Sequence, residues 1–233
     1  MVRSLPIISK QNTASSFVSG SAKGFFAGLA SHYSVHARDR KVQRLTPGRP
    51  LKKLFEAAAD PEAEIWFGDE VHFQLHTTTT RMWALKGHQP EIASKPGREK
   101  VGFIGVVCPA TGELFAKIAF KFNTTTFIGF LKCFLAARKG SGKKIWLVLD
   151  NASWHKKALW QLALENPDDL GVIFLPPYSP DLNPIERLWR LTRRFCTHNK
   201  YFDSLDELAA TVFGFFSIHA DPNDTLRQLC AIT

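Results

Sequence analysis

The sequence predicts an α/β domain built on a mixed β-sheet. Two short, continuous apolar runs, 145–149 and 172–175, have the composition of buried parallel strands. They alternate with segments that carry helical signals, whereas the region before them, 65–122, contains several strand-like segments separated by turn residues. A succession of strands followed by alternating helices and strands is typical of a layered α/β fold.

The first half begins with a short helix and continues as strands. We expect the helix over 51–59, ending near Asp60-Pro61. The run 65–69 is apolar and closes on Asp69, and alternation of apolar and polar residues continues over 71–75. Three further strands are expected, at 81–85, 101–107 and 113–122.

Helices dominate the second half. We expect four of them, at 124–138, 156–164, 184–198 and 204–218. Gly140 follows the first as a stop signal, and Pro184 occupies the first position of the third. Ser204 and Glu207 form a capping box at the start of the last helix.

The charge of the chain favours a polyanionic partner. Its 233 residues carry 30 Lys and Arg against 21 Asp and Glu, a net charge of +9. Most of the excess lies in residues 1–60, which hold ten basic and three acidic residues.

No apolar run approaches the roughly 20 residues of a membrane helix, so we expect no membrane association. The four cysteines are far apart and form no CxxC pair, which is typical of reduced thiols in an intracellular protein.

Residues 1–50 differ in composition from the rest. They are rich in Ser, Ala, Gly and basic residues and have no sustained periodicity. Three interpretations stay open: a disordered basic arm, the remnant of a lost DNA-binding region, and a transit peptide. We therefore expect two regions, this segment and a folded domain over 51–233.

Three acidic residues are candidates for a shared site. Asp69 and Asp150 each follow a buried strand, and in α/β sheets functional groups gather beyond the carboxyl ends of strands. Glu186 lies in the first turn of a helix whose start is fixed by the proline-rich stretch 176–184. Each acid alone has a structural explanation, such as the helix dipole for Glu186. Three converging carboxylates, however, repel each other unless a hard cation such as Mg²⁺ or Mn²⁺ neutralises them.

Three stretches then resemble the DDE endonuclease domain of mariner-type insertion-sequence transposases. They are WFGDE at 66–70, LVLDNASWH at 147–155 and LPPYSPDLNPIERLW at 175–189. Glu186 comes 36 positions after Asp150, which fits the family's spacing. The resemblance covers about residues 50–220 and implies an RNase H-like fold, a mixed five-stranded sheet flanked by helices. It also implies DNA strand cleavage and strand transfer with two Mg²⁺ or Mn²⁺ ions, held by Asp69, Asp150 and Glu186.

The resemblance has one departure. Full-length relatives carry N-terminal helix-turn-helix domains that recognise the ends of the element, and the residues before 51 are too few for that module. We therefore expect a truncated transposase, or the catalytic half of a divided one, that acts on element ends and target DNA. A homodimer is compatible with this interpretation, and the expected location is the cytoplasm, at the nucleoid. The alternatives are an inactive or domesticated transposase-derived DNA-binding protein and an RNase H-type nuclease.

Further residues lie near the three acids in sequence. Glu70 must point to the opposite face of its strand from Asp69, so we expect it not to bind metal. Three candidates could support the ligands by hydrogen bonds, with turn formation, capping or packing as their structural alternatives: Asn151, His155 and Asn183.

The helix that carries Glu186 also carries arginines. Candidates for contacts to DNA phosphates are Arg190, Arg193 and Arg194. Arg190 and Arg193 share a helix face with Glu186, so a solvated face with an internal ion pair is the alternative. Trp83 and Trp154 are candidates for stacking on an unpaired base.

Overall fold

The computed structural model of this chain describes residues 48–166, 168–177 and 179–231. One five-stranded sheet forms its centre, with the strand order β3-β2-β1-β4-β5. The strands are β1 (Ala63–Gln74), β2 (Lys100–Cys108), β3 (Glu113–Ala119), β4 (Lys144–Leu149) and β5 (Leu170–Phe174). The first three are antiparallel, whereas β1, β4 and β5 run parallel, so the sheet is mixed as predicted.

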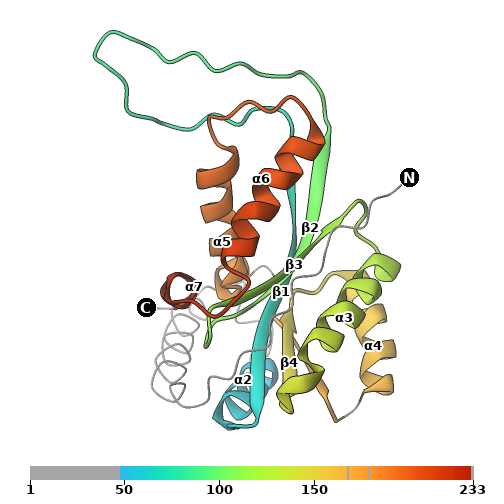
Figure 1. Cartoon of the computed structure of the whole chain (residues 1–233). Coiled ribbons are helices and arrows are strands. Elements are labelled where there is room, and N and C mark those ends of the chain that lie inside the picture. The colour runs from blue at the N-terminus through green and yellow to red at the C-terminus, as the bar shows by residue number, and fades with distance from the viewer. Residues whose placement is uncertain (1–47, 167, 178, 232–233) are drawn as a thin grey trace.

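Helices cover both faces of this sheet (Figure 1). The α-helices are α2 (Gly48–Ala59), α3 (Thr124–Arg138), α4 (Ser153–Glu165), α5 (Ile185–Thr192), α6 (Leu205–Ile218) and α7 (Asp224–Cys230). A π-helical segment, Arg193–Thr197, extends α5. Within the described ranges, no helix is long and apolar enough to cross a membrane.

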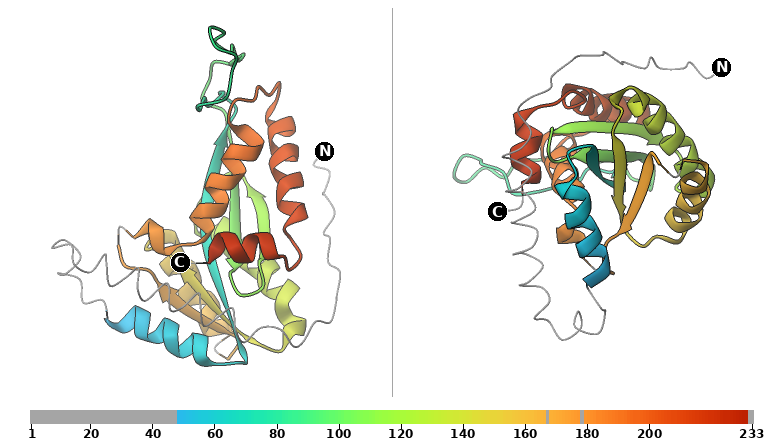
Figure 2. Two further views of the ribbon diagram at one scale, coloured as in Figure 1. Left: turned by 90° about the vertical axis from the view of Figure 1, so that its left-hand side faces the viewer. Right: turned by 90° about the horizontal axis from the view of Figure 1, so that it is seen from below.

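Two apolar clusters form the core, one on each face of the sheet. Side chains of α3 and α4 pack on one face against Trp66, and side chains of α2, α5, α6 and α7 pack on the other against Phe67. Figure 2 shows these two helical layers on either side of the strands. Because Trp66 and Phe67 are adjacent in β1 and both buried, the central strand is covered on both faces. Polar side chains further along β1 are therefore enclosed between helices as well.

The structure corrects one predicted strand and several element bounds. Residues 81–85 are not a strand: they belong to the long connection between β1 and β2, which projects beyond the sheet (Figure 1). None of the described strands pairs with them, and Met82, Trp83 and Leu85 are exposed. The strand expected over 113–122 ends at Ala119, and α7 was not predicted.

Of the N-terminal region expected over 1–50, residues 1–47 lie outside the described part of the chain. Its last three residues begin α2, so the helix predicted over 51–59 starts at Gly48.

Candidate active site

The register of β1 and β4 places Asp69 and Asp150 at the same edge of the sheet. The two strands run parallel, and Phe67 pairs with Val148. Asp69 and Asp150 each follow two residues later, Asp69 still within β1 and Asp150 directly after β4. Neighbouring strands are about 4.8 Å apart, so the two segments are adjacent where these acids emerge.

A buried asparagine brings Glu186 to the same edge. Asn183 lies in the turn before α5, and its Nδ2 donates a hydrogen bond to the Gly68 carbonyl at 3.0 Å. This bond attaches the start of α5 to β1 next to Asp69, and Glu186 follows in the first turn of α5. The negative charges of Glu186 and Asp150 both act on Asp69. The structure therefore gathers the three predicted acids in one region.

Asp69 is enclosed by the α5 side of the sheet. Its Oδ2 accepts a hydrogen bond from the Trp189 indole Nε1 at 3.1 Å. The indole lies over Gly105, the residue that pairs with Asp69 on β2, and a Cβ at Gly105 would stand 2.7 Å from the ring. Burial, and then the charge of Glu186, raise the pKa of Asp69 to about 8. In the absence of a cation, this carboxyl is therefore mostly protonated at neutral pH.

Asp150 has the opposite environment. Its side chain is 55% exposed, and its Oδ1 accepts the Ala152 N–H at 3.0 Å. The same oxygen lies 2.7 Å from Nδ1 of His155, in an ion-pair contact whose N–H is not well aligned for a hydrogen bond. The contact with His155 holds the pKa of Asp150 below its usual value, although partial burial opposes the shift.

His155 is completely buried between two carboxylates. Its Nε2 lies 2.8 Å from Oε1 of Glu70, which also accepts a hydrogen bond from Trp154 Nε1 at 3.1 Å. Burial alone would lower the pKa of His155, but its contacts with Asp150 and Glu70 outweigh burial and raise the pKa to about 9. Glu70 thus faces α4 rather than the side of Asp69, as the strand alternation predicts.

The remaining asparagine, Asn151, also supports the end of β4. Its Nδ2 donates a hydrogen bond to the Leu175 carbonyl just past β5. Asn151 and Asn183 therefore each connect an acid-bearing segment to a neighbouring strand. Oδ1 of Asn183 is buried and has no hydrogen-bond partner among the described residues.

The three arginines have different surroundings. Arg190 and Arg194 are exposed on α5 and its π-helical extension. Arg193 is half-buried, and its guanidinium lies over the Phe73 ring at 5.8 Å from the centroid. Arg190 and Arg194 are therefore more available to a ligand than Arg193.

Sequence reasoning missed the roles of Trp189 and Glu70. Trp189 was not among the candidate site residues, because an indole N–H bonded to a carboxylate has no sequence signature. The sequence offered only an indirect signal for this pair: a buried indole N–H and a buried carboxylate each need a hydrogen-bond partner. For Glu70 the sequence analysis predicted only that it does not bind metal. A carboxylate on a buried strand nevertheless requires a hydrogen-bond donor, and this requirement was the signal for its contact with His155.

The donor set fits a hard divalent cation. Three carboxylates offer only oxygen ligands, and a cation would neutralise their negative charge. Among the described residues, no three His, Cys, Asp or Glu side chains are arranged to hold a metal ion as they stand.

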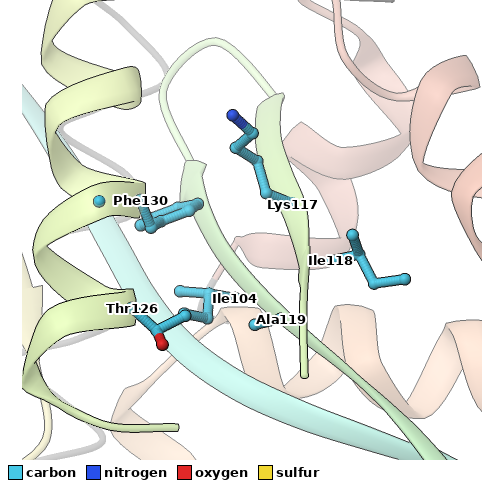
Figure 3. Close-up of a pocket in the computed structure, with 7 residues that line it drawn as sticks. Ile104, Lys117, Ile118, Ala119, Thr126 and Phe130 are labelled. Carbon is cyan, nitrogen blue, oxygen red and sulfur yellow. The ribbon is translucent and has the colours of Figure 1, made fainter. Parts of the chain in front are cut away.

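A separate hollow of about 160 Å³ lies between β3 and α3 (Figure 3). Its lining is mostly apolar, with Ile104, Ala119 and Phe130 among the residues that form it. None of the three acids lines it, so it is not part of the candidate active site.

Comparisons with known proteins indicate which proteins this chain is similar to. Residues 64–209 match the profile of the family described as DDE superfamily endonuclease. The insertion element IS630 uncharacterized 39 kDa protein of Shigella sonnei is 30% identical over 164 residues, which cover 70% of this chain and 47% of that protein. The uncharacterized protein y4pE/y4sA of Sinorhizobium fredii (strain NBRC 101917 / NGR234) is 31% identical over 104 residues, which cover 45% of this chain and 73% of that protein. This chain thus spans about half the length of the insertion-element protein.

Solved structures of the Mos1 transposase share the fold. The paired-end complex with the left transposon end has a TM-score of 0.57 and 14% identity, covering 97% of this chain and 62% of that chain. The Mos1 strand transfer complex has a TM-score of 0.56 and 14% identity, covering 96% and 62%. Identity at this level supports the fold alone, and the predicted RNase H-like architecture is confirmed.

Proposed function

Because the chain belongs to the DDE superfamily of endonucleases, we propose that it is the catalytic domain of an insertion-element transposase of the IS630/mariner type. The proposed reaction is cleavage and transfer of DNA strands, and the proposed domain spans residues 51–233. One observation carries the proposal. Asp69 and Asp150 emerge side by side from parallel strands, and Asn183 brings Glu186 to Asp69.

We propose that Asp69, Asp150 and Glu186 hold two divalent ions, Mg²⁺ or Mn²⁺. Two such ions would supply an activated attacking oxygen and charge stabilisation at the leaving oxygen. Asp150 is ionised and half-exposed, so it is the acid best placed to meet a cation first. Asp69 would then lose its proton, because a nearby positive charge favours the ionised carboxylate. Two of the Mos1 complexes are described with Mn and with Mg, which supports this choice of ions.

The proposed partner is DNA, both the ends of the element and the target. Arg190 and Arg194 are exposed on the helix that carries Glu186, where they would contact phosphates without reading sequence. The basic excess of residues 1–50 would add to this attraction. Because the chain covers 47% of the insertion-element protein, recognition of specific element ends is proposed only for the complete transposase.

We also propose that two copies associate through the connection between β1 and β2. Met82, Trp83 and Leu85 are exposed there, and Trp83 is fully so. Exposed apolar side chains on a projecting segment favour burial against another protein surface. Size-exclusion chromatography with light scattering tests this: Trp83→Ser should shift a dimer toward monomer, whereas Trp160→Ser on α4 should not. A monomer at every concentration of the parental protein would contradict the proposal.

Metal-dependent nicking of supercoiled plasmid by the purified protein tests the proposed function. We expect nicked circles with Mg²⁺ or Mn²⁺, none with EDTA, and none from an Asp69→Asn, Asp150→Asn or Glu186→Gln variant. An inactive transposase-derived protein would instead bind the plasmid without nicking it. Preferential cleavage of the RNA strand in an RNA–DNA hybrid would favour the RNase H-type nuclease.

A further inference from the structure

Three side chains connect the α4 side of β1 to the candidate metal ligand Asp150. Glu70 Oε1 lies 2.8 Å from His155 Nε2, and His155 Nδ1 lies 2.7 Å from Asp150 Oδ1. Glu70 and His155 are buried, with 7% and 0% of their side chains exposed, whereas the side chain of Asp150 is 55% exposed. Two buried groups therefore contact a third that faces solvent.

The imidazole is fixed on every side. The ring of Phe127 on α3 packs against it with a centroid distance of 4.4 Å. The backbone N–H of His155 donates to the Ala152 carbonyl at 3.1 Å, which places His155 in the first turn of α4. Trp154 donates to the same Glu70 oxygen and so restrains that carboxylate. The imidazole cannot turn away from Asp150 without losing its contacts with Glu70 and Phe127.

The second contact has a structural role and a further consequence. Glu70 satisfies only Nε2 of the buried imidazole, so Nδ1 faces Asp150, whose half-exposed carboxylate could otherwise remain in water. The contact also restricts rotation of Asp150, which costs side-chain entropy. This entropy cost is offset when the restricted carboxylate binds a ligand that requires it in one orientation.

We propose that His155 and Glu70 are positioning residues for metal binding. His155 occupies Oδ1 of Asp150 and leaves the other carboxylate oxygen for a cation, while Glu70 and Trp154 hold the imidazole in that orientation. This inference rests on the proposed function, in which Asp150 binds metal. Residues that contact a metal ligand in this way change the affinity for the metal, because they fix the orientation of the ligand.

Two substitutions of His155 separate its two contacts. In His155→Asn the amide nitrogen takes the place of Nδ1, so the contact to Asp150 can persist while the contact to Glu70 is lost. In His155→Gln the amide nitrogen takes the place of Nε2, so the contact to Glu70 can persist while that to Asp150 is lost. Binding of Mn²⁺ alone to the full chain, followed by electron paramagnetic resonance, measures the consequence. We expect His155→Gln to weaken Mn²⁺ binding about tenfold or more, and His155→Asn to weaken it severalfold less.

Three further variants complete the test. Leu162→Val perturbs packing of the same helix without touching the three side chains, and we expect parental Mn²⁺ affinity. The side chain in Glu70→Met cannot accept a hydrogen bond from His155, so this variant should weaken Mn²⁺ binding at least threefold. It takes the place of His155→Gln in the comparison if circular dichroism shows that His155→Gln does not fold. Asp150→Asn identifies the ligand itself.

The outcomes separate this inference from the proposed function. If Asp150→Asn leaves Mn²⁺ affinity unchanged, Asp150 is not a ligand and both ideas fail. If Asp150→Asn abolishes binding but the two His155 variants bind with equal affinity, the positioning role is overturned and the proposed function stands. A weaker His155→Gln beside a nearly parental His155→Asn supports positioning.

Discussion

Asp69 and Asp150 lie at the same register on neighbouring strands, yet their surroundings shift their pKa values in opposite directions. Asp69 is covered by Trp189 on the α5 side, and burial with the charge of Glu186 raises its pKa to about 8. Asp150 is half-exposed on the α4 side, and its contact with His155 lowers its pKa. One candidate ligand is therefore mostly neutral without metal and the other is ionised.

This difference shows how a site with three acids remains stable before metal arrives. Three ionised carboxylates in one region would repel one another strongly, because interactions between charges strengthen as water is excluded. Protonation of Asp69 removes one charge, and the buried His155 balances a second. The comparison predicts that the same Asp→Asn change has different consequences at the two positions.

The largest expected effect is loss of cleavage in Asp150→Asn. Asparagine is nearly isosteric, so the fold should persist, but one negative charge facing the proposed cations is lost. Each tenfold change in rate requires only about 1.4 kcal/mol, so we expect several decades of nicking activity to disappear. Plasmid nicking rates with Mg²⁺ measure this, with circular dichroism as the control for folding. A variant that nicks at close to the parental rate would remove Asp150 from the site.

The next effect concerns stability without metal. The native pKa of Asp69 lies above its unfolded value, so the native state holds a proton that the unfolded state releases as pH rises through about 4. Parental stability should therefore fall between pH 4.5 and 6.5, and Asp69→Asn should remove this part of the slope. The difference in melting temperature between variant and parent, measured in EDTA, should increase with pH.

Asp150→Asn provides the matched control for this measurement. The native pKa of Asp150 lies below its unfolded value, so its contribution to stability is already complete above about pH 4.5 and is lost only as pH falls further. Its difference from the parental protein should be constant from pH 4.5 to 6.5. Equal slopes for the two variants would contradict the comparison.

The sequence was sufficient to predict the positions of the acids but not their environments. An apolar run ending on an acid marks both Asp69 and Asp150, because a buried strand fixes where its last residue emerges. Contacts with residues distant in sequence help to separate them. Trp189 is 120 positions from Asp69, and His155, which lies close to Asp150 in sequence, is held by Glu70, 85 positions away. Local pattern carries no information on such pairs.

The error at residues 81–85 has a related cause. A short apolar run forms a strand only where another strand can pair with it, and this segment projects beyond the sheet. By contrast, Asn223 caps α7 by accepting the Leu226 N–H at 2.9 Å, so this short helix had a readable start signal.

A smaller effect is expected from the indole that contacts Asp69. Trp189→Phe keeps most of the ring but removes the N–H donor, and hydrogen bonds to charged groups contribute about 1.5–3 kcal/mol. We expect about tenfold weaker Mn²⁺ binding with nearly parental melting temperature. Trp146→Phe is the control, because that indole packs by Gly171 at the far end of the sheet. Equal affinities for the two variants would show that Trp189 only fills the core.

The smallest effect concerns the side from which DNA approaches. Arg190 and Arg194 are exposed on α5 and its π-helical extension, the same helical segment that carries Glu186. If phosphates bind there, each arginine lost should reduce the slope of log affinity against log salt by about 0.9 and weaken binding only severalfold. Lys132→Gln on α3, exposed on the other layer, removes the same charge and should leave the slope unchanged. Fluorescence anisotropy with a labelled duplex at several salt concentrations distinguishes the two. If Arg190→Gln and Lys132→Gln lower the slope equally, the attraction depends on net charge alone, and the α5 side has no special part in binding DNA.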